Sequence, residues 1–263
     1  MMRALAALVA AALLLGCASE RPRELRVCAD PNNLPFSNRA GQGFENRLVD
    51  LIANDLGARP RYIWWAQRRG NVRETLNEGL CDLIPGVAAE LEMLATTRPY
   101  YRSTYVALTR ADRGLDIRSF DDPRLPSLKI GVQMIGDDFS NTPPAHALAR
   151  RGLIRNVRGY MVYGDYREPA PQARIVEAVA AGEIDVAFVW GPVGGYFARR
   201  QPVPFAVSAV AVSPGERFRM SFAVAMGTRR RDERLRTEVN AILARRAPEI
   251  RRLLDDYGVP TVG

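Results

Sequence analysis

The stretch VCADPNNLPFSN, residues 27–38, joins a short apolar strand to a polar loop that contains an aromatic residue. The strand is predicted over residues 25–29, and Pro31 ends it because proline has no N–H to donate to a sheet. Asn32 and Asn33 suit the turn that follows, and Phe36 is predicted to line the mouth of a cleft. A strand that opens into such a loop is typical of α/β folds, whose ligands bind beyond the ends of the strands.

The residues that follow this stretch alternate between helix and strand patterns. Apolar residues at helical spacing follow Gly43, and Gly57 ends this first helix. Strands are predicted over residues 61–65 and 81–87, with a short helix over residues 72–77 between them. This β-α-β-α-β order implies a parallel sheet with right-handed crossovers. The loop after residue 29 therefore lies at the carboxyl end of the sheet, where ligands are expected.

The helix and strand patterns begin again after a polar stretch, which predicts a second α/β unit. We expect a discontinuous first lobe, residues 21–113 and 213–263, and a second lobe, residues 114–212. Two segments, near residues 110–115 and 206–213, would cross between the lobes and leave a cleft. The further predicted strands are 103–109, 129–133, 184–190, 205–212 and 218–226, and the further predicted helices are 144–151, 172–181 and most of 232–257.

The first 20 residues have the pattern of a secretory signal peptide. One arginine precedes an apolar run over residues 4–15, which is too short to span a bilayer, and small residues follow. Two cleavage patterns compete: residues 14–17 resemble a lipobox that would leave a lipid on Cys17, and residues 16–18 fit an ordinary site. We expect a protein exported to a bacterial periplasm, and held at a membrane only if Cys17 is lipidated.

The composition is that of a globular protein with a strong arginine bias. The chain has 263 residues, of which 47% are hydrophobic and 25% are charged, and its formal net charge is +8. An exported protein rarely meets nucleic acid, so we expect no nucleic-acid partner. An acidic protein or an anionic membrane surface is the expected counterpart. The alternative is a solvated, arginine-rich surface that contacts no partner.

Two cysteines, Cys28 and Cys81, remain beyond the predicted signal peptide. An isolated pair in an oxidising compartment is typical of a disulfide, and the two residues can meet if their strands pair side by side. The alternative is two buried free thiols. Two cysteines and the single His146 lack the spacing of a zinc site. Because nucleophile, P-loop and dinucleotide motifs are also missing, we assign no catalytic, cofactor-binding or metal residue.

Several motifs resemble those of the type II solute-binding proteins of amino-acid uptake systems. They span most of the predicted mature chain and are Leu34-Pro35-Phe36, Gly43-Phe44-Glu45, Gly79-Leu80-Cys81-Asp82, Pro99-Tyr100-Tyr101 and Gly182-Glu183-Ile184-Asp185. The resemblance implies an α/β fold of the two-lobed, type II periplasmic binding protein kind, with two inter-lobe crossings. Fold alone does not decide function.

A more specific set of strings is similar to the solute-binding-like proteins associated with quinoprotein dehydrogenases, a family that includes the MoxJ and XoxJ accessory proteins of methanol oxidation. The strings are CADPNNLPFSN at residues 28–38, YIWW at 62–65, QRRG at 67–70 and TRPYYRSTY at 97–105. This resemblance implies a non-catalytic periplasmic protein that helps a methanol or alcohol dehydrogenase dependent on pyrroloquinoline quinone (PQQ) to mature or become active. The cytochrome c of that system is a further candidate partner. The resemblance does not imply that this chain binds the quinone.

The chain departs from the amino-acid uptake proteins at both charged positions of their ligand site. Those proteins hold the α-carboxylate with an arginine shortly after the third strand, and the matching position here is Glu90, which would repel a carboxylate. They hold the α-ammonium with an acidic residue near the end of a later strand, where this chain has Trp190. We therefore expect no tight binding of free α-amino acids.

Aromatic and arginine side chains supply the remaining candidates for a cleft or a docking surface. Tyr105 and Trp64 belong to the aromatic set, and each aromatic residue taken singly is also explained by core packing. Side chains alternate along a strand, so Trp64 and Trp65 face opposite ways, and we expect Trp65 to reach the cleft or the surface. Arg68 and Arg69 are predicted at the cleft rim, and with Trp65 and Tyr101 they are the favoured partner contacts. The full set of candidate cleft or partner contacts is Asn32, Asn33, Phe36, Trp65, Arg68, Arg69, Glu90, Tyr100, Tyr101 and Trp190.

Three classes of function stay open at this point. The first, favoured by the more specific strings, is a non-catalytic accessory protein for a periplasmic quinoprotein dehydrogenase. The second is a solute-binding protein of an ABC uptake system whose ligand is not an amino acid. The third is a small periplasmic lyase or dehydratase in which Glu90 acts as acid or base in a closed cleft. We expect a monomer in each case.

Overall fold

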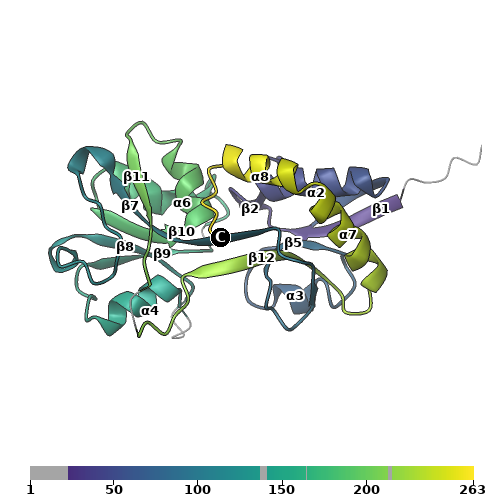
Figure 1. Ribbon diagram of the computed structural model, residues 1–263, viewed down its shortest axis with the longest axis horizontal. Helices are drawn as coiled ribbons and strands as arrows, with labels where there is room; N and C mark the ends of the chain where they lie inside the picture. The colour runs from purple at the N-terminus through teal and green to yellow at the C-terminus, as the bar shows by residue number, and fades with distance from the viewer. Residues whose placement is uncertain (1–22, 137–140, 164, 213–214) are drawn as a thin grey trace, which may run out of the picture.

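The computed structural model describes residues 23–136, 141–163, 165–212 and 215–263. They form two α/β lobes that lie side by side along the long axis of the molecule (Figure 1). The predicted signal peptide, residues 1–20, and Cys17 lie outside the described residues. Within the described ranges, no helix combines the length and the hydropathy that crossing a bilayer requires.

The first lobe is built on the parallel strands that the sequence predicts. Strand β1 (Arg23–Ala29) pairs in parallel with β4 (Ala58–Trp64) along its whole length. An isolated parallel bridge joins Val27 to Leu83, just before β5 (Ile84–Ala88). The helices of this lobe are α2 (Phe44–Asp55), α3 (Asn71–Glu74), α7 (Glu233–Arg245) and α8 (Ala247–Asp256).

Helix α2 closes the core of the first lobe with one apolar face. Phe44, Leu48 and Ile52 recur at helical spacing and are fully buried. They pack in one cluster with Val27 of β1 and with Val239 of α7. Residues from both ends of the described chain therefore share a single core, as expected for a discontinuous lobe.

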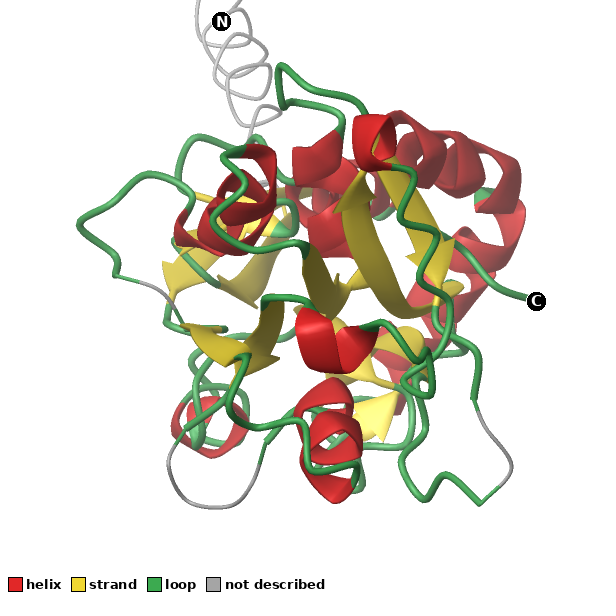
Figure 2. Cartoon of the chain, turned by 90° about the vertical axis from the view of Figure 1, so that its left-hand side faces the viewer, coloured by secondary structure: helices red, strands yellow, loops and turns green. Residues whose placement is uncertain are grey.

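The second lobe has helices on both faces of its strands (Figure 2). Strand β8 (Ile130–Met134) is parallel to β9 (Val157–Met161) and to β10 (Val186–Trp190). Alternate residues of β10 enter different cores, because Val186 and Phe188 belong to one apolar cluster and Ala187 and Val189 to another. The remaining elements of this lobe are η1 (Ala111–Arg113), η2 (Leu125–Ser127), α4 (Pro143–Arg150), η3 (Pro171–Ala173), α5 (Arg174–Ala180), α6 (Gly191–Ala198) and β11 (Phe205–Ala209).

Two crossings join the lobes. Strand β7 (Tyr101–Arg110) pairs with β12 (Ser221–Thr228) through its first half and with β10 and β11 through its second half. The chain returns to the first lobe between β11 and β12, and β12 also pairs with β5 and with the short β6 (Ala95–Thr96). Because β7 is continuous, the boundaries at residues 113 and 212 stay predictions.

The loop after β1 folds back onto the start of α2. It contains the short antiparallel pair β2 (Asn32–Asn33) and β3 (Ser37–Asn38). The N–H of Phe44 donates to the carbonyl of Pro35 at 2.8 Å, and the N–H of Glu45 donates to that of Phe36 at 2.9 Å. Only glycine fits at Gly43, where a Cβ would lie 1.9 Å from the oxygen of Phe36. The loop therefore holds Phe36 and Glu45 close together.

Cys28 of β1 and Cys81 form a disulfide with their Cα atoms 5.6 Å apart. The bridge lies in a small apolar cluster with Leu76, Ile84 and Leu94. It ties the first strand to the segment that leads into β5, as the sequence predicts. The alternative of two buried free thiols is wrong for this structure.

The structure also differs from the predicted elements in several places. The predicted helix over residues 232–257 is two helices, because Pro248 lies in the first turn of α8, where its missing N–H is tolerated, and α7 ends before it. The predicted strand 205–212 ends at Ala209 as β11. The sequence patterns do not predict β9 or α6.

Candidate functional site

A cavity of about 310 Å³ lies between the two lobes. Asn33 and Gln67 follow the carboxyl ends of β1 and β4, while Gln133 and Trp190 lie at the carboxyl ends of β8 and β10. The cavity therefore lies at the carboxyl ends of the parallel strands of both lobes. The lining residues are Asn33, Phe36, Glu45, Gln67, Gly86, Val87, Ala88, Tyr101, Tyr105, Gln133, Val162, Gln172, Trp190, Val193, Phe222 and Val224.

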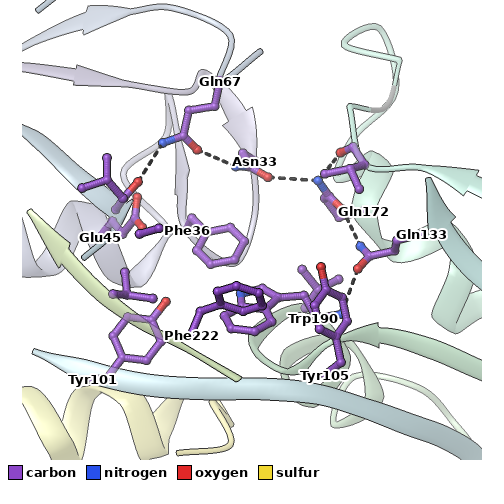
Figure 3. A pocket seen from close by; sticks show the side chains of 16 residues that line it. Asn33, Phe36, Glu45, Gln67, Tyr101, Tyr105, Gln133, Gln172, Trp190 and Phe222 are labelled. Atoms are coloured by element: carbon purple, nitrogen blue, oxygen red, sulfur yellow. Dashed lines mark hydrogen bonds between the residues drawn. The ribbon is translucent and has the colours of Figure 1, made fainter. Parts of the chain in front are cut away.

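A row of amide side chains runs along one edge of the cavity (Figure 3). Asn33 Nδ2 donates to Gln67 Oε1 at 3.1 Å, and Gln172 Nε2 donates to Asn33 Oδ1 at 3.1 Å. Gln133 Nε2 donates to Gln172 Oε1 at 3.2 Å, and the N–H of Trp190 donates to Gln133 Oε1 at 2.8 Å. The bond between Asn33 and Gln172 joins the two lobes, so neutral hydrogen bonds hold this edge of the cleft closed.

A buried carboxylate, Asp30, makes a second contact between the lobes. It is 2% exposed and accepts hydrogen bonds from the N–H of Asn32 at 2.8 Å and from the N–H of Gln67 at 2.8 Å. The hydroxyl of Tyr166, from the second lobe, donates to its Oδ2 at 2.5 Å. Burial and this bond to Asp30 raise the pKa of the Tyr166 phenol. Arg68 lies over the same ring, 5.1 Å from its centroid.

Aromatic rings form the opposite edge of the cavity (Figure 3). Tyr101 and Tyr105 lie four residues apart on β7, so they share one face of that strand. The ring of Trp190 lies 5.3 Å from that of Tyr105 and 6.0 Å from that of Phe222, in edge-to-face arrangements. Such packing fixes the positions of the rings.

One carboxyl group, that of Glu45, lies in the lining of the cavity. Glu45 is 3% exposed, and its Oε2 has no hydrogen-bond partner. Burial raises the pKa of this carboxyl to about 8, and the nearby Asp30 carboxylate adds to the effect. Room for the group exists because residue 86 is glycine: a Cβ there would lie 2.0 Å from Glu45 Oε1.

Comparison with known proteins supplies the family. The sequence is 35% identical to the protein named MoxJ of Methylorubrum extorquens over 253 residues, which cover 90% of this chain and 81% of that protein. The chain belongs to the MoxJ family. The MoxJ of Paracoccus denitrificans is 29% identical over 90% of this chain and 88% of its own length. A scan against protein-family models finds no match.

A solved structure supports the same assignment. The crystal structure of the periplasmic binding protein XoxJ from Methylobacterium extorquens AM1 aligns with a TM-score of 0.74 at 34% identity, and the alignment covers 91% of this chain and 99% of that one. XoxJ is described as a binding protein rather than as an enzyme. The two-lobed binding-protein fold predicted from the sequence is confirmed.

In this MoxJ-family chain, four of the predicted contact residues meet in the cavity: Asn33, Phe36, Tyr101 and Trp190. Tyr101 is 7% exposed, so it can meet a ligand in the cavity but not a protein at the surface of this closed form. Tyr100 lies behind the wall, where its hydroxyl donates to the carbonyl of Pro85 at 3.1 Å.

Other predicted contacts lie on the rim between the lobes. The side-chain amide of Asn32 donates to the backbone carbonyl of Glu168 at 2.8 Å. Trp65 is 39% exposed, whereas Trp64 is half-buried and stacks on Tyr62, as alternation along β4 predicts. Arg68 and Arg69 are exposed, and the guanidinium of Arg68 lies over the ring of Tyr166. We call Trp65, Arg68 and Arg69 the rim residues, and their contact with a partner stays a prediction.

The position of Glu90 corrects one expectation. Glu90, which the sequence comparison places at the carboxylate-binding position, is exposed and pairs with Arg219 outside the lining of the cavity. The carboxyl that faces the cavity is instead Glu45, at the start of α2. Its motif, Gly43-Phe44-Glu45, is visible in the sequence, but nothing there indicates that the acidic side chain is buried.

Sequence reasoning also missed most of the polar lining. Gln67 lies in a quoted string, and Gln133 ends a predicted strand, so the rule that ligands bind at carboxyl ends could have found both. Gln172 and Phe222 carry no such signal. The described lining contains neither Arg nor Lys, and protonation keeps Glu45 largely uncharged at neutral pH. Such a lining offers a carboxylate ligand no countercharge.

Proposed function

We propose that this protein is a non-catalytic accessory protein of a periplasmic, PQQ-dependent methanol or alcohol dehydrogenase and supports the maturation or activity of that enzyme. The observation that carries the proposal is an inter-lobe cavity, in a MoxJ-family chain, whose described lining has no Arg or Lys for an amino-acid carboxylate. A carboxylate ligand needs a guanidinium or an equivalent donor set when it is buried. The described lining therefore lacks the carboxylate-binding group that an amino-acid uptake protein needs.

The proposed location is the periplasm. It rests on the signal-peptide pattern of residues 1–20 and on the description of the relative XoxJ as a periplasmic binding protein. Cleavage before Cys17 would add a lipid anchor, whereas ordinary cleavage would release the protein. Mass spectrometry of the mature N-terminus distinguishes the two, because a lipidated cysteine carries the mass of its acyl chains.

The rim residues are the proposed contact with the dehydrogenase. Arg68 and Arg69 are exposed. Burial raises the pKa of the Tyr163 phenol, and the positive charges of the two arginines partly offset that rise. Both arginines therefore lie near the junction of the lobes. A guanidinium binds a carboxylate in a bidentate manner, and the exposed indole of Trp65 beside them can serve as an apolar anchor. An acidic patch on the dehydrogenase, or on its cytochrome c, would complement this surface.

The two alternative functions have weaker support. An uptake protein with a ligand other than an amino acid is favoured by one observation, the cavity between the lobes. A lyase or dehydratase loses the acid-base group assigned to it, because Glu90 pairs with Arg219 outside the lining. We therefore retain the accessory role as the proposed function.

Surface plasmon resonance with the purified dehydrogenase of the same organism tests the proposed contact. Rim charges act mainly on the association rate, so reversing Arg68 and Arg69 to Glu should slow association several-fold and flatten its dependence on salt. The matched control reverses Arg251 and Arg252, an exposed pair on α8, and should associate as the unsubstituted protein does. Equal effects of both pairs would move the contact elsewhere, and no binding at micromolar concentration would contradict the proposal.

A further inference from the structure

The proposed accessory role assigns no function to the carboxyl of Glu45, which is buried in the lining of the cavity. A carboxyl group in a protein interior normally has hydrogen-bond partners, because burying an unpaired polar atom costs free energy. Glu45 Oε2 has none, although the side chain is 3% exposed and lines the cavity. A positively charged donor in the cavity would supply a partner for this carboxyl.

The surroundings of the carboxyl specify the sign of the ligand's charge. The described lining contains no Arg or Lys that could neutralise an ionised Glu45, and Asp30 lies close enough to disfavour its ionisation further. Behind the aromatic wall, the exposed Arg219 guanidinium lies 5.8 Å from the centroid of the Phe222 ring. The electrostatic influence of Glu45 also reaches the phenols of Tyr62, Tyr100 and Tyr101. A cation in this cavity would meet the carboxyl of Glu45 and the aromatic rings along one edge.

We propose that the cavity binds a small alkylammonium cation, with the ammonium group against Glu45 Oε2 and the alkyl group against the rings of Tyr101, Trp190 and Phe222. The volume of about 310 Å³ is at the lower end of the range of ligand pockets and leaves ample room for a small alkylammonium cation. This inference does not depend on the dehydrogenase proposal, and each can fail without the other.

Binding of such a cation is coupled to the release of a proton. Burial keeps the Glu45 carboxyl protonated in the empty cavity, and the ammonium group binds the ionised form. On binding, the O–H bond of the carboxyl breaks, the proton leaves to the solvent, and the carboxylate pairs with the ammonium. The apparent affinity should therefore rise about tenfold per pH unit up to about pH 7 and level off around pH 8.

Calorimetry with n-propylammonium chloride tests the inference. This amine stays charged over the whole range, since its pKa is close to that of lysine, about 10.4. At pH 7 binding should release up to one proton to the buffer. The measured binding enthalpy should therefore change with the ionisation enthalpy of the buffer. Two matched probes are propan-1-ol, which lacks the charge, and α-aminobutyrate, which is propylammonium with an added carboxylate. Both should bind at least tenfold more weakly than propylammonium.

The matched variants are Glu45→Gln, which keeps the size of the side chain, and Glu78→Gln, which removes an exposed carboxyl of the same lobe. Glu45→Gln should lose at least tenfold in affinity at pH 8 and lose the pH dependence, and Glu78→Gln should retain both. Equal affinity of Glu45→Gln, or no propylammonium binding at millimolar concentration, would overturn the inference. If Glu45→Gln failed to fold, proton release by the unsubstituted protein would decide the question alone.

Discussion

Replacing Glu45 by glutamine should remove a pH-dependent loss of stability that the buried carboxyl imposes. Burial raises the pKa of Glu45 from 4.5 to about 8 in the folded protein. The unfolded chain then ionises at lower pH than the folded one, so the folded state binds more protons between these two values. The free energy of unfolding of the unsubstituted protein therefore falls as pH rises from 4.5 to 8, and below pH 4.5 the effect is absent.

The size of this effect follows from the two pKa values. They differ by 3.5, from 4.5 to about 8, and each tenfold change is worth about 1.4 kcal/mol, so the full loss is about 5 kcal/mol. Glutamine does not titrate, so the free energy of unfolding of Glu45→Gln lacks this loss. Between pH 4.5 and pH 8 the variant should therefore gain about 5 kcal/mol in stability relative to the unsubstituted protein. Half of it would already be a large fraction of the stability of a typical domain.

Urea unfolding followed by tryptophan fluorescence, at pH 4.5, 6, 7 and 8.5, measures the difference directly. Glu78→Gln, at an exposed position of the same lobe, is the control and should follow the unsubstituted protein at every pH. If the free energies of unfolding of Glu45→Gln and of the unsubstituted protein changed with pH in parallel, the reasoning would be refuted. The carboxyl would then be ionised in the folded state or solvated by water.

Three further outcomes are expected. Replacing both Cys28 and Cys81 by serine should cost about 4 kcal/mol in urea unfolding, because the bridge closes a loop of 53 residues; two alkylatable thiols in the native protein would contradict the bridge itself. Tyr166→Phe removes the hydroxyl that bonds to Asp30 across the lobes, which should cost about 1.5–3 kcal/mol and favour an open form in small-angle scattering; an unchanged profile and stability would exclude this role. Calorimetry with the standard α-amino acids should detect no micromolar ligand, and one such ligand would restore the uptake function.

Much of the fold could be predicted from local patterns in the chain. Apolar spacing finds α2, and the short apolar runs find β1, β8 and β10, because each of these elements buries a regular set of side chains. Helix α6 was not predicted because it is buried on every side and rich in glycine, so it has no polar face to reveal its period. Gly195 belongs there for a tertiary reason: a Cβ would lie 1.9 Å from the oxygen of Gly258.

The site was less predictable, because its side chains meet only after folding. The amide row joins Asn33, Gln67, Gln133 and Gln172, which come from four separate segments of two lobes. Glutamine and asparagine are ordinary surface residues, so their types carry no signal of burial. The sequence likewise offers many acidic residues, and only the position of Glu45 opposite Gly86 shows which one faces the cavity.

Deleting the gene and assaying the dehydrogenase tests the proposed accessory role most directly. PQQ-dependent methanol or alcohol dehydrogenase activity and bound PQQ are measured in periplasmic extract from the parent, the deletion strain and the deletion strain carrying the gene on a plasmid. The proposed role predicts that activity or PQQ content falls in the deletion strain and returns with the plasmid. Full activity and full PQQ content in the deletion strain would contradict it.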